Sequence, residues 1–208
     1  MRQRISLEEA QVLLRAAVRP LGRETLPAAS ALGRTLAQDV AAPLDQPPFD
    51  RSPLDGYALR SADTAQASPE HPVTLEVVEI VYAGAVPSRS LERGQAIRVM
   101  TGAMLPSGCD CVVPWEATDN GMGSVRLYKP LAPHANYCDR GEDYRAGELL
   151  LPAGTALDAA ALGVLSSAGT ETVSVLRRPS AAVLSTGDEV VSPHTHPLPP
   201  RQIYAANR

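Results

Sequence analysis

The sequence has few aromatic residues, few cysteines and no long apolar run. Only 4% of its 208 residues are aromatic, so we expect Leu, Val and Ala to build the core. Cys109, Cys111 and Cys138 lack the paired spacing of a zinc site, which predicts free thiols. No apolar run approaches the roughly 20 residues that span a bilayer, and none follows the basic start of the chain. These absences predict a cytoplasmic protein without a membrane helix or a signal peptide.

The sequence is also short of positive charge. Lys and Arg number 19 against 23 Asp and Glu, which gives a net charge of −4 and argues against nucleic-acid binding, since that function needs a basic face. Hydrophobic and charged residues make up 44% and 20%, as in ordinary globular proteins, so intrinsic disorder is excluded. The 15 Gly and 19 Pro predict many turns and short strands. The length suits one or two domains.

The first part of the chain favours helix. Residues 6–19 carry apolar residues at helical spacing, and Ser6 and Glu9 have the spacing of a capping box. A second short helix is predicted over residues 28–39. A stiff, proline-rich loop follows at residues 43–53, and such a loop can hold polar groups in place.

From about residue 74 to residue 128 the sequence is typical of β structure. Short apolar stretches are separated by Gly, Pro, Asn and Asp, as in a small barrel or sandwich. The Asn120-Gly121 pair predicts a hairpin turn. We expect strands at residues 73–78, 80–82, 96–100, 111–115 and 124–128.

Beyond Gly141 strands and helix alternate. We expect strands at 148–151 and 171–176 and a helix at 158–168. A further strand at 180–185 is largely apolar, as buried parallel strands are. Parallel strands need neighbours and covering helices, and fewer than 25 residues follow this one. We therefore expect an α/β domain that begins here and is incomplete.

Four polar clusters set among Gly and Pro are the candidate sites. Backbone N–H groups and hydroxyls can receive an anion, Arg can pair with a carboxylate or phosphate, and carboxylates can hold a cation or act as bases. Each cluster alone also fits a structural role, as a turn, a hairpin or a solvated loop. Together they suggest one composite site for an anionic ligand. The clusters are residues 47–58, with Asp50, Ser52 and Asp55; 99–116, with Thr101 and Gly102; 140–143, with Arg140 and Asp143; and 181–191, with Ser185, Thr186, Gly187, Asp188 and Glu189.

These clusters contain the motifs PPFDRSPLDGYA, VMTGAMLPSGCDCVV, RGED and VLSTGDE. In their order and spacing the chain resembles the molybdopterin molybdenumtransferases, the MoeA family. The segments ALGRTLAQDVAAPLDQPPFD and QIYAANR are similar as well, so the resemblance covers essentially the whole chain. It implies the last step of molybdenum cofactor synthesis. In that step molybdenum from molybdate enters adenylylated molybdopterin and AMP is released, with a divalent cation, usually Mg²⁺.

The resemblance also implies a multi-domain α+β fold. Residues 1–20 would form a helix that packs on an α/β domain, and residues 21–45 and 147–177 an elongated connecting body. Residues 46–146 would form a small β domain, resembling a barrel or sandwich, and residues 178–208 the truncated beginning of a molybdopterin-binding α/β domain. The family is homodimeric, and its cleft lies between the β domain of one subunit and the α/β domain of the other. Contact with the molybdopterin adenylyltransferase is a further expectation.

Carried over from the family, Asp55, Asp143 and Glu189 are expected to be catalytic, and no metal ligands are assigned. Arg51, Pro53 and Met104 depart from the family's usual residues without replacing a matched polar one. The glycine-rich pterin-binding loop is absent from the sequence, so the chain alone is expected to be inactive. The alternative is a non-catalytic dimeric scaffold or binding module. The residues expected to bind substrate are Thr101, Gly102, Arg140, Ser185, Thr186, Gly187 and Asp188.

Overall fold

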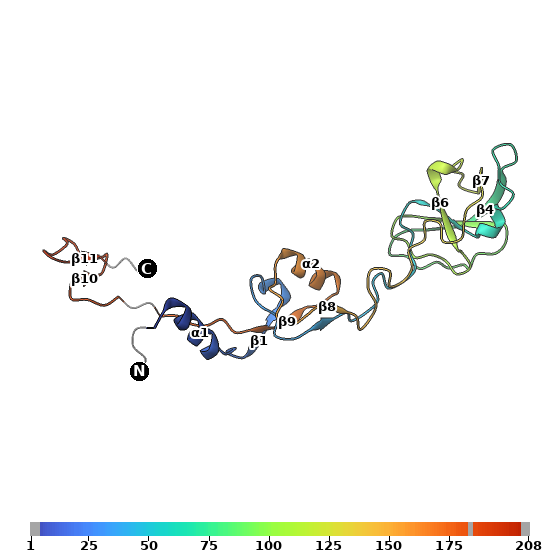
Figure 1. Ribbon diagram of the computed structural model, residues 1–208. Helices are drawn as coiled ribbons and strands as arrows, with labels where there is room; N and C mark the ends of the chain where they lie inside the picture. Colours follow the sequence, from blue (N-terminus) through green and yellow to red (C-terminus); the bar gives the residue numbers. More distant parts are fainter. Residues whose placement is uncertain (1–4, 183–184, 205–208) are drawn as a thin grey trace.

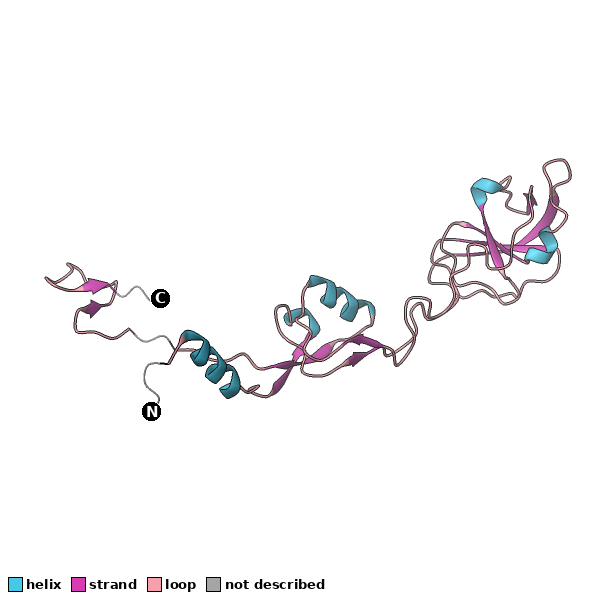
Figure 2. Cartoon of the chain, in the orientation of Figure 1, coloured by secondary structure: helices cyan, strands magenta, loops and turns pink. Residues whose placement is uncertain are grey.

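The computed structural model describes residues 5–182 and 185–204. The molecule is elongated: both terminal segments lie at one end, a five-stranded sheet at the other, and a smaller body between them (Figure 1). Strands outnumber α-helices, of which the described residues contain two (Figure 2). The chain is mostly sheet with few helices, and in this coarser respect the α+β prediction is confirmed.

The first helix, α1 (Leu7–Ala17), forms where the sequence predicts it. The Ser6 hydroxyl accepts a hydrogen bond from the Glu9 backbone N–H at 3.2 Å, and the Glu9 carboxylate accepts one from the Ser6 N–H at 3.4 Å. The capping box is therefore confirmed. The helix buries none of its residues, and Leu7 is 69% exposed. Its packing partner stays a prediction.

The body is built from two segments that are far apart in the sequence. The helix of the body, α2 (Ala159–Ser167), begins after Asp158. The Asp158 side chain caps it by accepting a hydrogen bond from the Ala161 N–H at 2.8 Å. Two antiparallel strand pairs, β1 with β9 and β2 with β8, join the segments. The elements are β1 (Arg23–Pro27), η1 (Ala28–Ser30), β2 (Val40–Ala41), β8 (Leu149–Leu151), α2 (Ala159–Ser167) and β9 (Thr172–Leu176). The core residues are Ala31, Leu36, Leu157, Ala161, Leu165, Val173 and Val175.

The helix predicted over residues 28–39 is wrong. Only the single turn η1 is helical, and Gly33 then adopts a left-handed φ of +70°. The N–H of Leu36 donates to the Thr155 carbonyl, and that of Ala37 to the Ser174 carbonyl, both at 2.9 Å. These backbone groups bond to the second segment of the body rather than to their own preceding turn. Contacts distant in sequence therefore override the local apolar spacing.

The β domain contains one sheet with the strand order β6-β3-β5-β4-β7. Strand β3 is antiparallel to β5 and β6, while β4 is parallel to β5 and antiparallel to β7. The two strands predicted at 73–78 and 80–82 are one long strand, and the others form where expected. The elements are β3 (Gly56–Leu59), η2 (Ser61–Thr64), β4 (Val73–Val81), β5 (Gln95–Val99), β6 (Cys111–Pro114), η3 (Trp115–Ala117) and β7 (Ser124–Leu127).

Strand β3 is a structural element that the sequence analysis missed, because it treated residues 47–58 as a loop. All four of its residues are buried, and alternate residues enter opposite faces of the sheet: Tyr57 and Leu59 one, Ala58 the other. Only glycine fits at position 56, because a Cβ there would lie 2.1 Å from the Val113 carbonyl oxygen. The Asp-Gly pair therefore begins a central strand and does not form a turn.

The predicted turn at Asn120-Gly121 forms, but it does not join two neighbouring strands of the sheet. Strands β6 and β7 lie at opposite edges of the sheet, and η3 lies between them in the sequence. Asn120 does turn the chain, with a left-handed φ of +53°. A bridge from Thr118 to Leu127 connects the chain beyond β6 to β7, so the sheet curls toward a barrel.

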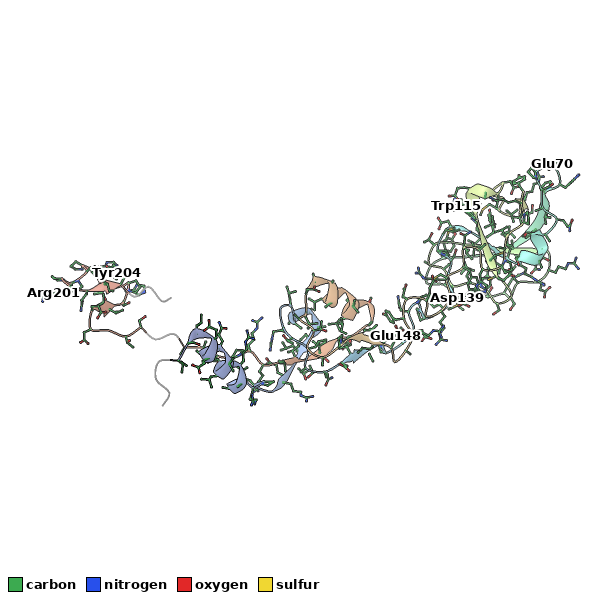
Figure 3. The ribbon with its side chains drawn as sticks, viewed as in Figure 1. Glu70, Trp115, Asp139, Glu148, Arg201 and Tyr204 are labelled. Atoms are coloured by element: carbon green, nitrogen blue, oxygen red, sulfur yellow. The ribbon has the colours of Figure 1, made fainter. Side chains whose placement is uncertain are left out.

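Two chain segments side by side join the β domain to the body. The N–H of Gln46 donates to the Tyr144 carbonyl at 2.8 Å, and the N–H of Tyr144 donates back to the Gln46 carbonyl at 3.3 Å. The chain therefore enters and leaves the β domain at one place. Figure 3 labels Asp139 and Glu148 on either side of this junction.

The C-terminal part contains a short parallel pair of strands, β10 (Val190–Val191) and β11 (Ile203–Tyr204). The strand predicted at 180–185 does not form at 180–182 or at Ser185, and residues 183–184 lie outside the described residues. No described strand pairs with residues 180–182 or with Ser185. Of the QIYAANR segment, residues 205–208 also lie outside. None of the helices described could cross a membrane.

Candidate functional site

The carboxylate of Asp55 is bonded to Thr101 at one edge of the sheet in the β domain. Asp55 precedes β3 and Thr101 follows β5, and these strands are antiparallel neighbours with Gly56 opposite Val99. Their adjoining ends therefore meet at one edge of the sheet. Asp55 Oδ1 accepts hydrogen bonds from the Thr101 backbone N–H at 2.7 Å and from the Thr101 hydroxyl at 2.8 Å.

These hydrogen bonds keep Asp55 ionised. The Thr101 backbone N–H, and after it the Thr101 hydroxyl, hold the pKa of the carboxyl below its usual range because both donate to the charged form. Arg98 on β5 adds a smaller favourable charge. Arg98 is itself buried, with its guanidinium 5.0 Å from the ring centre of Trp115 and 5.6 Å from that of Tyr57. Sequence analysis had not singled out Arg98.

The Thr101-Gly102 turn uses its own backbone donors. The N–H of Ala103 donates to the Met100 carbonyl at 2.9 Å, and the left-handed φ of +81° at Gly102 suits this turn. The Gly102 N–H donates to the Ser52 carbonyl at 2.8 Å, and that of Thr101 to Asp55. The backbone donors expected to receive an anion are therefore engaged within the chain. Substrate binding at this turn stays a prediction that rests on the exposed Thr101 side chain.

Arg140 is held in place by two aspartates. Its Nε donates to Asp45 Oδ2 at 2.6 Å, and its backbone N–H donates to Asp50 Oδ1 at 2.8 Å. Asp50 also accepts from the Tyr137 hydroxyl at 2.7 Å. The Ala146 N–H and then Arg140 lower the pKa of Asp45. The Arg140 side chain is 64% exposed against 19% for Asp45, so its terminal nitrogens face solvent and can bind an anion.

Asp143 is the unengaged carboxylate of this region. Its backbone N–H donates to the Gln46 carbonyl at 2.9 Å, which fixes the main chain. The side chain is exposed and makes no hydrogen bond or ion pair with the residues described. It is therefore free to hold a cation or accept a proton. Among residues 5–182 and 185–204, no three His, Cys, Asp or Glu side chains gather to hold a metal ion.

The fourth cluster lies at the opposite end of the molecule (Figures 1 and 3). Residues 185–189 are all exposed, and the Glu189 carboxylate folds over Gly187, where an added Cβ would lie 2.6 Å from Glu189 Oε2. The Glu189 carbonyl accepts a hydrogen bond from the Ile203 N–H at 2.7 Å. Within a single chain, hydrogen bonds link the cluster at 47–58 to those at 99–116 and 140–143. The fourth cluster lies apart from them; its residues are Ser185, Thr186, Gly187, Asp188 and Glu189.

The three cysteines are free thiols, as predicted. Burial, helped by the charge of Asp110, raises the pKa of Cys109 and of Cys111 to about 12. Both thiols are therefore protonated at neutral pH, which makes them poor nucleophiles.

Comparison with known proteins places the chain in a family. Residues 5–169 match the family model of the MoeA N-terminal region (domain I and II), so the chain belongs to this family. Molybdopterin molybdenumtransferase 2 of Mycobacterium tuberculosis is 41% identical over 202 residues, which are 97% of this chain and 50% of the relative. The molybdopterin molybdenumtransferase of Bacillus subtilis is 39% identical over 180 residues, 85% of this chain and 42% of the relative.

A solved structure agrees with this assignment. The crystal structure of the molybdopterin biosynthesis moeA protein from Pyrococcus horikosii matches with a TM-score of 0.85 and 40% identity, over 96% of this chain and 51% of that one. The family resemblance seen in the sequence motifs is confirmed. The chain spans about half the length of the relatives it matches.

Proposed function

We propose that this chain acts in molybdenum cofactor biosynthesis, as the part of a molybdopterin molybdenumtransferase that carries the β domain. The reaction inserts molybdenum from molybdate into adenylylated molybdopterin and releases AMP. The observation that carries the proposal is a set of polar residues in the β domain: Asp55 bonded to Thr101 at the ends of β3 and β5, Arg140 anchored by Asp45 and Asp50, and Asp143 with an unengaged carboxylate. The relatives named as molybdenumtransferases support it.

Each residue has a distinct task in this proposal. Arg140 binds an oxyanion or a phosphate through its terminal nitrogens, because Asp45 engages only Nε. Asp55 orients the Thr101 hydroxyl, whose oxygen can accept a hydrogen bond from substrate while its proton points to Asp55. Asp143 accepts a proton or holds a cation. Gly102 lets the chain turn beside the substrate.

Magnesium is part of the proposal. Mg²⁺ usually binds to one or two carboxylates together with substrate phosphates, so it does not need a site made of three protein side chains. The exposed, unengaged carboxylate of Asp143 fits such a role. When bound, the cation would neutralise phosphate charge at the departure of AMP.

A second copy of the chain completes the site. Glu189 and its neighbours Ser185, Thr186, Gly187 and Asp188 lie far from the β domain of their own chain (Figure 1). We place them against the β domain of a partner in a homodimer, where Glu189 adds a catalytic carboxylate and the others bind substrate. Contact with the molybdopterin adenylyltransferase, which would supply the adenylylated substrate, belongs to the same proposal.

The test compares this chain with a chimera in which the unmatched half of the M. tuberculosis relative follows residue 208. Adenylylated molybdopterin and molybdate are supplied, and AMP release is measured. We expect no release from the chain alone and clear release from the chimera. The complete M. tuberculosis relative is the positive control. If it releases AMP and the chimera does not, the non-catalytic scaffold becomes the better description.

A further inference from the structure

Glu79 lies at an irregularity in β4. The pairing of β4 with β5 passes from Val77 opposite Ala96 to Glu79 opposite Ile97, so Val78 is an extra residue and forms a β-bulge. A bulge bends its strand and redirects the side chains that follow. Here the side chain that follows is a carboxylate.

The Glu79 carboxylate accepts hydrogen bonds from the loop that contains Ser88 and Arg89. Glu79 Oε1 accepts hydrogen bonds from the Ser88 N–H at 3.0 Å and from the Ser88 hydroxyl at 2.9 Å. Glu79 Oε2 accepts one from the Arg89 N–H at 3.2 Å. Hydrogen bonds to a charged acceptor are the stronger kind, so Glu79 ties down the end of the segment 82–90.

The segment 82–90 lies along the Thr101-Gly102 turn. The Ala83 Cβ is 3.9 Å from the position that a Cβ on Gly102 would take, and the Met100 N–H donates to the Val81 carbonyl at 3.2 Å. Further along, residues 86–90 and 104–107 together line a cavity of about 200 Å³. The segment therefore flanks both the turn and the residues that follow it.

We propose that Glu79 is a positioning residue: it holds the segment 82–90 against the Thr101-Gly102 turn and so keeps Thr101 aligned with Asp55. The functional side of this inference rests on the proposed function, in which Thr101 binds substrate. Glu79 bonds to neither Asp55 nor Arg140, and its effect passes through the loop that it holds.

The first test measures amide hydrogen exchange in the chain itself. Glu79→Ala should raise exchange roughly tenfold at Ser88 and Arg89, and also at Thr101 and Gly102, because three hydrogen bonds to a charged acceptor are lost. Glu79→Gln keeps one acceptor oxygen and should have a smaller effect. Glu76→Ala is the matched control, since Glu76 is an exposed glutamate of the same strand whose side chain bonds to none of the described residues.

Two results would overturn the inference. One is unchanged exchange at Ser88 and Arg89 in Glu79→Ala; the other is a rise there with Thr101 and Gly102 as in the wild type. If Glu79→Ala fails to fold, Glu79→Gln and Ser88→Ala give the same comparison in milder form. Ser88→Ala removes only the hydroxyl bond to Glu79.

The second test measures kinetics in the chimera. Glu79→Gln should raise KM for molybdate about fivefold and change kcat less, while Glu76→Ala changes neither. Equal kinetic constants in the two variants would overturn the positioning role. A wild-type chimera without activity would count against the proposed function instead, and the exchange measurements would still decide whether Glu79 supports the turn.

Discussion

The carboxylates of the β domain and those of the C-terminal segment differ in what they already bind. Asp45, Asp50 and Asp55 each accept two hydrogen bonds from the β domain's own chain. The Glu189 side chain, in the C-terminal segment, accepts none from the described residues, and Asp143 at the β domain's edge resembles it. The sequence motifs contain Asp50, Asp55, Asp143 and Glu189 without distinction, and Asp45 lies just before the first motif. The contacts separate carboxylates that are hydrogen-bonded within the chain from carboxylates that bond to none of the described residues.

The largest effect is expected where the free carboxylates are removed. Asp143→Asn and Glu189→Gln should each lower AMP release by the chimera roughly 100-fold, as loss of an acid or base group does. The melting temperature should stay the same, because neither side chain holds the described structure. Asp139→Asn, an exposed aspartate of the same loop as Asp143, is the control for activity. A fall in melting temperature together with activity would show that Asp143 or Glu189 stabilises the fold.

A smaller effect, dependent on pH, is expected for Asp55→Asn. The folded-state pKa of Asp55 lies below the ordinary value of 3.8, so the unfolded chain binds the proton more readily. The stabilisation is therefore fully present above that value and is lost as pH falls through the lower folded-state pKa. The variant should melt below the wild type at pH 6, and the gap should narrow by pH 3.

Thermal unfolding at pH 6, 4 and 3 measures this gap, with Asp143→Asn as the control. A gap that stays constant over the pH range would show that the hydrogen bonds from Thr101 do not depend on the charge of Asp55. The comparison between bonded and free carboxylates would then lose its electrostatic basis.

The folded protein is expected to change least when it is exposed to thiol reagents. Cys109 and Cys111, with pKa values raised to about 12, hold little thiolate at pH 8, and burial raises the pKa of Cys138 as well. Iodoacetamide should label the folded chain at least about 100-fold more slowly than the chain in guanidinium, as read by intact mass. All three cysteines lie in the β domain, so labelling reports its opening and not that of the body. Rapid labelling of native protein would contradict the buried environment.

The parts of the fold that depend on neighbours in sequence were predicted well. The capping box of α1 is local, and so are the alternation and turns that mark most strands of the sheet. The helix predicted over residues 28–39 is wrong because backbone groups there bond to residues more than 100 positions away. Strand β3 was missed because its Asp-Gly start has the composition of a turn, whereas Gly56 is required by the close approach of Val113.

The site was predicted residue by residue but not as contacts. Asp55 and Thr101 were both named, yet their hydrogen bonds depend on the pairing of β3 with β5. Asp45 was missed because its partner Arg140 lies 95 positions further along the chain. The position of the Glu79 side chain depends on a bulge at Val78, and no sequence pattern indicates that bulge.

The junction at Gln46 and Tyr144 has a consequence for the order of folding. The body pairs Arg23 with Leu176, and the whole β domain lies between them in the chain. An unfolded segment of that length makes closure entropically costly, and the cost grows with the length of the loop. Once the β domain folds, Gln46 and Tyr144 are side by side, and the body has to close only its own short segments. We therefore expect the inserted domain to fold first and to bring together the two halves of the body that surrounds it.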